Sequence, residues 1–508
     1  MKFINHTFLL LLAIGIFACT NLEEELREDL TGEQAKQLLL ESADVSALLQ
    51  GAYEDLRGPF QGQEQYFATQ EITADGCIPP TRGPDWDDNG KWRALHNHTF
   101  DGDHPDQTAT FNNLLKVVFN TTNILNFQPS PSQAAEARFI RALAMFSVAD
   151  AWNQVPFREP GENLLEAPRV LKGAEAVDFI IGELNEILPD LPDGPATKAN
   201  KDAARALLMK CYLNRGTFAD RQNPKFDGGD MTQVVTLADQ IEASGRGYAL
   251  SDNFYDNFAP DNDQKSTELI FANFNDGGVS SGNIRSRWYC GTHYNMNPSG
   301  WNGFATLADF YDKFEDGDER KEAEYAGVTD VSGMKVGFLI GQQFDQNGNA
   351  LQDRKGNPLA FTREVALIET GNNLEITGIR VMKWPPDYVN TGDHADNDYV
   401  HFRYADVLLM KAEAMLRNGN EPDARAIVNE IRAKRNASTI NTLTLDGMLD
   451  ERAREMYWEG YRRQDLIRFG KFLDAWHEKP ASGPERLLMP IPNTALAVNP
   501  NLEQNPGY

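Results

Sequence analysis

Apolar residues recur every three or four positions through much of the first half of the chain and again near its C-terminus. This spacing puts them on one face of an α-helix. In the first half, the pattern predicts helices at about 31–57, 109–127, 174–188, 200–215 and 232–243. Near the C-terminus, it predicts helices at about 404–417, 421–435, 446–461 and 464–476.

Local signals mark some of the helix ends. Ser130, Pro131 and Gln133 form an N-cap, a first-turn proline and a capping glutamine, so we expect a helix to begin there and continue to about Trp152. Gly58 and Pro59 are expected to stop the helix at 31–57.

Helices of this length, joined by short turns, are typical of antiparallel helical hairpins, the unit of tetratricopeptide-like scaffolds. Ala412, Ala414 and Ala424 would allow close contact between such helices. We therefore predict a mostly α-helical fold whose scaffold covers about 31–57, 109–245 and 402–476.

Two regions do not follow the helical pattern. Residues of about 58–108 are rich in glycine, proline, aspartate and aromatic residues, and about 250–400 is rich in loops with short β signals such as 269–271. The segments Asp345–Asn349 and Asp353–Asn357 recur with a period of eight, which indicates hairpin turns. Long irregular regions on a helical scaffold are usually functional, so we expect a ligand site here.

The charge balance narrows the class of ligand. Lys and Arg total 48 against 75 Asp and Glu, which gives a formal charge of −27. A nucleic-acid binder needs a basic face, so we expect no nucleic-acid partner. Charge-driven binding to anionic lipid is disfavoured for the same reason.

The N-terminus has the pattern of an export signal. Lys2 precedes an apolar run of ten residues at 8–17, which is too short to span a bilayer because spanning takes about 20. Ala18 and Cys19 end the run in a way that resembles a bacterial lipoprotein box. We expect a signal peptide at 1–18, a lipid on Cys19 that anchors the chain to a membrane, a tether at 19–30 and a single domain at 31–508.

Three further cysteines bear on redox chemistry. Cys211 lies in an apolar helical stretch and is expected to be a buried thiol. Cys77 and Cys290 could form a disulfide in an oxidising compartment, but nothing in the sequence fixes their separation.

Several segments of the second half carry a family resemblance. The sequences from Phe402 to Ala414, from Glu451 to Arg468 and from Met489 to Pro492 resemble the SusD/RagB family of outer-membrane lipoproteins. In the first half, 137–142 and 178–191 agree with the same family. The resemblance thus extends over nearly the whole chain beyond the signal peptide.

The resemblance implies a tetratricopeptide-like body that carries an irregular ligand-binding face. It also implies a lipid-anchored protein of the outer membrane, facing the extracellular side. Such a protein binds an oligosaccharide, or in some members a peptide, and passes it to a SusC-like TonB-dependent transporter. It has no enzymatic activity and no cofactor.

The tryptophans supply the candidate site, because sugar rings pack their C–H faces on indole rings. Trp152, Trp458 and Trp476 fall in predicted helices and are expected in the core. The irregular regions hold the other five: Trp86, Trp92, Trp288, Trp301 and Trp384. The family places ligand contacts at about 75–100 and 283–304, so we expect stacking by Trp86, Trp92, Trp288 and Trp301 and polar contacts from Arg82, Asn89, Tyr289 and Asn302.

Other patterns leave alternatives open. Asp85, Asp87 and Asp88 could supply the paired carboxylates of a glycoside hydrolase. A helical-repeat adaptor without a small-molecule site is a further alternative. The histidines at 96 and 98 and the Asp345 turn have features of metal sites, but we interpret them as loop polarity and hairpin chemistry and expect no metal.

Three glutamates, Glu451, Glu455 and Glu459, share one face of a predicted helix. Arginines at 452, 454, 462 and 463 surround them, so we predict a structural ion-pair network rather than an acid/base site.

Overall fold

The computed structural model of the chain describes residues 40, 42–390 and 392–508. The predicted signal peptide, the lipidation at Cys19 and the tether lie outside the described residues. All elements below belong to the unit Val45–Tyr508. No helix in the described ranges has both the length and the apolar character required to cross a bilayer.

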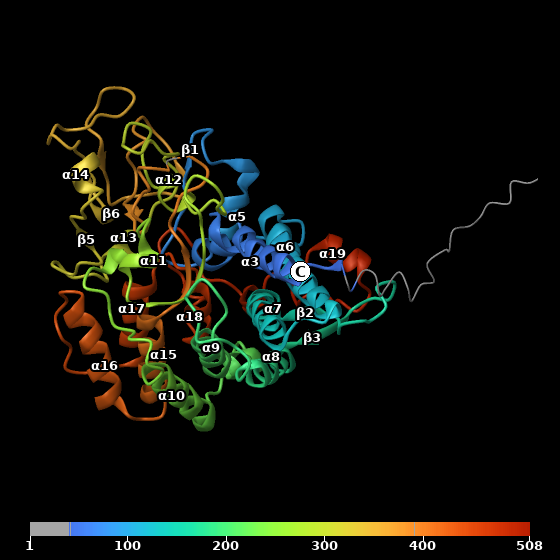
Figure 1. The fold of residues 1–508 in the computed structure, drawn as a ribbon. Helices are drawn as coiled ribbons and strands as arrows, with labels where there is room; N and C mark the ends of the chain where they lie inside the picture. Colours follow the sequence, from blue (N-terminus) through green and yellow to red (C-terminus); the bar gives the residue numbers. More distant parts are fainter. Residues whose placement is uncertain (1–39, 41, 391) are drawn as a thin grey trace, which may run out of the picture. The chain divides into compact units, whose positions relative to one another are not determined.

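Ten helices form the frame that the apolar periodicity predicted (Figure 1). They are α3 (Val45–Asp55), α6 (Pro105–Ile124), α7 (Pro131–Trp152), α8 (Gly173–Ile187), α9 (Lys201–Ala219), α10 (Gly228–Glu242), α15 (Tyr404–Arg417), α16 (Glu421–Lys434), α17 (Leu445–Met456) and α18 (Arg462–Arg468). From α6 to α10 each helix packs on the next, α10 packs on α15, and α15 on α16. The fold is therefore mostly α-helical and built from helical hairpins, as predicted.

The ends of these helices test the local signals. The side chain of Ser130 accepts a hydrogen bond from the backbone N–H of Gln133 at 3.3 Å, and the side chain of Gln133 accepts one from the N–H of Ser130 at 3.1 Å. The capping box that begins α7 is thus confirmed. Gly58 and Pro59 do not end the helical path, because both lie in a short helix, α4 (Arg57–Gln61). A proline is tolerated in a first turn, where its missing N–H has no helical acceptor.

The predicted alanine contacts are present as well. Ala412 and Ala424 are fully buried in a small core that α15, α16 and α17 share, and Ala414 is fully buried in the main core. The last predicted helix is shorter than expected: α18 ends at Arg468, and Gly470 follows in the left-handed conformation at φ 70°.

Short helices and paired strands make up the irregular regions, some connections between the scaffold helices, and the C-terminal segment. The helices are η1 (Ala68–Ile72), η2 (Asp88–Gly90), α5 (Lys91–His96), η3 (Leu125–Phe127), η4 (Phe254–Asn257), α11 (Asn262–Lys265), α12 (Ser286–Tyr289), α13 (Ala308–Tyr311), α14 (Thr329–Ser332), η5 (Pro484–Leu487) and α19 (Asn493–Val498). The antiparallel pairs are β2 (Gln154–Phe157) with β3 (Arg169–Lys172), β4 (Leu269–Asn273) with β11 (Tyr399–Arg403) and β7 (Gly341–Gln342) with β8 (Ala360–Phe361). A three-stranded sheet has the order β10 (Arg380–Met382), β6 (Val336–Leu339), β5 (Glu322–Ala323), and β1 (Thr81–Arg82) pairs in parallel with β9 (Ile368–Glu369).

The two predicted hairpin turns are confirmed. Isolated bridges join Phe344 to Ala350 and Gln352 to Pro358, one around each turn. Asp345 accepts hydrogen bonds from the backbone N–H groups of the residues two and four positions on, at 2.8 and 2.9 Å. The carboxylate therefore shapes the turn, which is the usual role of aspartate at this position.

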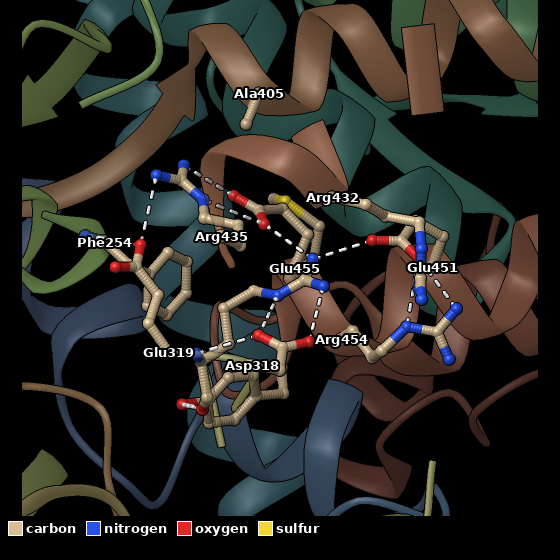
Figure 2. A network of polar contacts seen from close by, with 12 residues as sticks. Phe254, Asp318, Glu319, Ala405, Arg432, Arg435, Glu451, Arg454 and Glu455 are labelled. Carbon is tan, nitrogen blue, oxygen red and sulfur yellow. Dashed lines mark hydrogen bonds and ion pairs between the residues drawn. The ribbon is translucent and has the colours of Figure 1, made fainter. Parts of the chain in front are cut away.

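A buried network of charged side chains links the scaffold to the irregular region (Figure 2). Arg403 of β11 donates to Glu455 at 2.8 Å and to Glu459 at 2.8 Å. Arg435, just after α16, donates to the same Glu455 at 3.0 Å, and Arg320 from the irregular region does so at 3.0 Å. All of these side chains are at most 1% exposed.

The ion-pair interpretation of the three glutamates is confirmed, but most of the predicted partners are wrong. Only Arg454 binds the series, through Glu451 at 2.7 Å. The other three arginines pair elsewhere, and the glutamates recruit arginines from distant segments: Arg320, Arg403, Arg432 and Arg435. Burial alone would raise the pKa of Glu455, but the guanidinium groups of Arg435, Arg403 and Arg320 hold it well below its usual range.

The pKa of a different buried carboxyl group, that of Glu71, is raised. Glu71 of η1 is 1% exposed, and its Oε1 accepts hydrogen bonds from the N–H groups of Gly460 and Tyr461 at 2.8 and 3.2 Å. Its Oε2 has no hydrogen-bond partner among the described residues. Burial raises the pKa of Glu71 to about 7, against the lowering effect of those two N–H groups.

This shift predicts a pH-dependent stability. A folded-state pKa above the unfolded value of 4.5 stabilises the fold fully at low pH, and that stability is lost as the pH rises through about 7. Between pH 5 and pH 8, Glu71 should account for a loss of about 2–3 kcal/mol in the free energy of unfolding. Denaturant unfolding at the two pH values should show that the drop is smaller by this amount in Glu71→Gln. Equal drops in both proteins would refute the assignment.

Candidate ligand-binding site

The loops on either side of β1 meet the loop after α12 around a shallow hollow of about 390 Å³. We call it the aromatic hollow. It is lined by Gln63, Glu64, Asp85, Trp86, Asp88, Trp92, Tyr294 and Trp301. Figure 1 shows β1, α5 and α12 at one end of the molecule, opposite α10 and α16. Three of the four tryptophans predicted to stack on a ligand line this hollow.

Half-buried rings form a row along the hollow. The centroids of Trp86 and Trp301 are 6.5 Å apart at 51°, and those of Trp301 and Tyr289 are 5.3 Å apart at 45°. The indole N–H of Trp86 donates to the backbone oxygen of Trp301 at 3.0 Å, which fixes one ring relative to the other loop. Partly exposed aromatic faces of this kind suit a ligand with both apolar and polar groups.

The position of Trp86 depends on the backbone beneath it. A Cβ on Gly303 would lie 2.3 Å from two atoms of the Trp86 ring, so only glycine leaves room for the indole. Trp86 and Asn302 have φ of 61° and 51°, the left-handed region that bulky residues rarely adopt. Such backbone strain concentrates at ligand sites, where the surrounding structure holds it in place.

Arg82 and Asn302, which were predicted to make polar contacts with a ligand, do not face the solvent. Arg82 is 4% exposed, and its guanidinium donates to the backbone oxygens of Leu374 at 2.8 Å and Thr377 at 2.6 Å. Asn302 is 1% exposed, and its side-chain oxygen accepts from Arg380 of β10 at 2.9 Å. Both residues therefore anchor the loops of the hollow: Arg82 satisfies buried backbone carbonyl groups, and Asn302 accepts from a buried guanidinium.

Two of the tryptophans predicted to stack on a ligand have almost no exposed surface. Trp288 is 1% exposed and packs in the main core, because α12 turns this ring inward. Trp92 is 1% exposed at the floor of the hollow, where its ring lies 5.9 Å from that of Trp86 and its N–H donates to Asp88 at 2.6 Å. Asn89 is exposed on the adjacent turn but is outside the lining set, and Tyr289 extends the row of rings beside Trp301.

Tyr294 is a lining residue that the sequence did not single out. Its hydroxyl donates to Asp85 at 3.2 Å, and the guanidinium of Arg354 lies 4.0 Å from its ring centre. Arg354 comes from the second hairpin turn and is held by Glu375 at 2.7 Å. Burial and the charge of Asp85 raise the pKa of Tyr294, so the hydroxyl remains a donor at neutral pH. Gln63, Glu64 and Tyr294 all lie in the irregular regions, and the only available sequence signal was the aromatic ring of Tyr294 in such a region.

Other candidate residues lie in the interior. The ring nitrogens of His98 bond to the backbone oxygen of Thr73 and the hydroxyl of Ser482, both at 2.8 Å, and burial lowers the pKa of His96 to about 4. The cysteines at 77, 211 and 290 are buried free thiols. Trp152 and Trp458 are in the core as expected, whereas Trp476 follows α18 and is half-buried.

A second concavity is distinct from the aromatic hollow. This apolar groove of about 340 Å³ lies between α6 and the loop that joins β2 to β3. It shares no residue with the hollow, and its lining includes Phe119, 48% exposed, and Leu164, 64% exposed. The neighbouring Leu165 is 94% exposed. The groove is more apolar than the hollow, and its described lining residues include no tryptophan or tyrosine.

A helical-hairpin scaffold that carries an irregular face with a hollow lined by aromatic rings defines a class of binding protein. The model of the SusD family matches residues 267–508. The chain is 30% identical to the starch-binding protein SusD of Bacteroides thetaiotaomicron over 424 residues, which cover 74% of this chain and 73% of that protein. The chain belongs to the SusD family.

Solved structures share the fold. A surface glycan-binding protein A from Bacteroides uniformis superposes with a TM-score of 0.69 at 16% identity, over 91% of this chain and 98% of that one. A laminarin-binding SusD-like protein gives 0.68 at 20% identity, over 92% and 99%.

Proposed function

We propose that this protein binds an oligosaccharide without cleaving it, and that the aromatic hollow is the binding site. The observation that carries the proposal is the row of half-buried rings from Trp86 through Trp301 to Tyr289, with polar side chains alongside. Flat indole faces can pack on sugar rings, and Gln63, Asp85 and Asp88 can exchange hydrogen bonds with hydroxyl groups. The starch-binding and laminarin-binding relatives support a glycan as the ligand class.

Native electrophoresis through gels that contain single polysaccharides tests this proposal. At least one glycan should retard the wild-type protein, with an affinity in the range of about 1 μM to 1 mM. A reducing-sugar assay on the same glycan should show no product. Cleavage that Asp85→Asn abolishes would favour a hydrolase, and binding to a peptide mixture but to no glycan would favour a peptide carrier.

The family resemblance and the N-terminal signal extend the proposal to the cell surface. The protein would be anchored in the outer membrane by lipid on Cys19, would face the extracellular side, and would pass its ligand to a SusC-like TonB-dependent transporter. The exposed apolar groove supports a protein partner, because such patches mark interaction surfaces on soluble domains. Helix α6 separates the two sites: Asp106 in its first turn bonds to Lys91 beside the hollow, and Phe119 lies about 20 Å further along.

Leu165→Glu should weaken the association with the transporter about tenfold or more, because it puts a charge next to Leu164 at the edge of the apolar groove. Glycan retardation should be unchanged, since Leu165 is remote from the hollow. Val389→Glu is the matched control, with a side chain that is 90% exposed outside the groove. The measurement is the amount of transporter that co-purifies from detergent-solubilised outer membranes. Equal recovery with Leu165→Glu and wild type would place the partner elsewhere.

A further inference from the structure

The charged side chains that line the aromatic hollow are all carboxylates. Three carboxylates line it, from Glu64, Asp85 and Asp88. Asp85 and Asp88 are exposed, and the side chain of Glu64 is 53% exposed. Among the described residues, no lysine, arginine or histidine belongs to the lining.

The nearest cations already have carboxylate partners. Lys91 lies 4.2 Å from the centre of the Trp92 ring and bonds to Asp106 at 3.2 Å, with Glu64 at 3.6 Å. Arg93 pairs with Asp87 at 2.6 Å. Arg354 pairs with Glu375 at 2.7 Å. Lys91 therefore offsets part of the charge of Glu64, whereas in the described part of the chain no lysine or arginine forms an ion pair with Asp85 or Asp88.

The hydrogen bonds of the lining leave acceptors for a ligand. Asp88 receives the indole N–H of Trp92 on one oxygen, and Asp85 receives the hydroxyl of Tyr294 on one oxygen. Each carboxylate has a second oxygen that can accept from a sugar hydroxyl. Gln63, 7% exposed and part of the lining, also has an Oε1 without a hydrogen-bond partner in the described part of the chain.

From this arrangement we infer that the aromatic hollow takes uncharged saccharides and excludes those that carry carboxylate or sulfate groups. Hydroxyl groups donate to the carboxylates, whereas an anionic group would approach the carboxylates of Asp85 and Asp88, which have no cationic partner among the described residues, and would displace the water that screens them. The inference rests on the proposed function, because it concerns the ligand class of the same site.

The test compares one polysaccharide in two charge states. A panel of amylopectin, laminarin, galactomannan and xylan first identifies a neutral polymer that retards the wild-type protein. That polymer is then prepared in carboxymethylated form and in hydroxyethylated form. The two substituents are similar in size and differ in charge. The wild-type protein should bind the hydroxyethylated polymer at least about tenfold more tightly.

The triple variant Glu64→Gln, Asp85→Asn, Asp88→Asn should reduce that ratio toward one. A control variant removes the same number of charges at three exposed positions away from the hollow, whose side chains are 71%, 73% and 75% exposed: Glu186→Gln, Asp193→Asn and Asp446→Asn. The control should keep the wild-type ratio, which separates the local field from the net charge of −27. Raising the salt from about 0.01 M to about 1 M, which shortens the Debye length from about 30 Å to about 3 Å, should also reduce the wild-type ratio.

The outcomes distinguish this inference from the function on which it depends. The charge selection is overturned if the wild-type protein binds the carboxymethylated polymer as tightly as the hydroxyethylated one and Trp301→Ala loses this binding. The hollow would still be the binding site in that case. A ratio unchanged in the triple variant would do the same. If no polymer of the panel retards the wild-type protein in any form, the proposed function and the inference both fail.

Discussion

Replacing Glu455 by glutamine should lower the free energy of unfolding by about 3–5 kcal/mol. The carboxylate is fully buried and accepts hydrogen bonds from Arg403, Arg435 and Arg320, which come from three separate segments of the chain. Removing its charge leaves three buried guanidinium groups short of a partner, and such groups cannot recover their hydration inside the fold.

Denaturant unfolding near neutral pH measures this loss. The matched control is Glu322→Gln, which breaks an exposed pair with Lys335 whose side chains are 46% and 44% exposed. That change should cost less than about 1 kcal/mol. A loss in Glu455→Gln no greater than in the control would mean that the network contributes little to holding the irregular region on the scaffold.

Replacing Trp301 by alanine should weaken glycan binding about 10- to 100-fold, because it removes the central ring of the row between Trp86 and Tyr289. Trp301→Phe keeps a flat ring and should retain more of the affinity. Trp476→Ala is the control, since that tryptophan is also half-buried but lies outside the hollow. Calorimetric titration of the three variants measures the change. Equal affinity in Trp301→Ala and Trp476→Ala would exclude the hollow as the site.

The helical frame could be predicted because its signals are local. The capping box at Ser130 and the apolar periodicity through α7 to α10 are properties of short segments, and each required only its own neighbours. The boundaries were less secure where a local rule had an exception. Pro59, for example, is compatible with the first turn of α4, so a short second helix follows the end of α3 at Asp55 instead of a loop.

The exposure of individual side chains could not be predicted in the same way. Arg82 is buried because backbone oxygens at 374 and 377, almost 300 positions away, accept its hydrogen bonds. Trp288 is covered by a core assembled from both halves of the chain. The sequence therefore indicated the regions of the hollow and two of its partly exposed rings, Trp86 and Trp301, but not Tyr294 or the anchoring role of Asn302.

A crystal structure of the protein with a fragment of the retarding glycan tests the central claim most directly. We predict a sugar ring packed on Trp301 or Trp86, with hydroxyl groups within hydrogen-bond distance of Asp85, Asp88 or Gln63. Sugar density confined to the apolar groove or to another face, with the aromatic hollow filled only by solvent, would contradict the account.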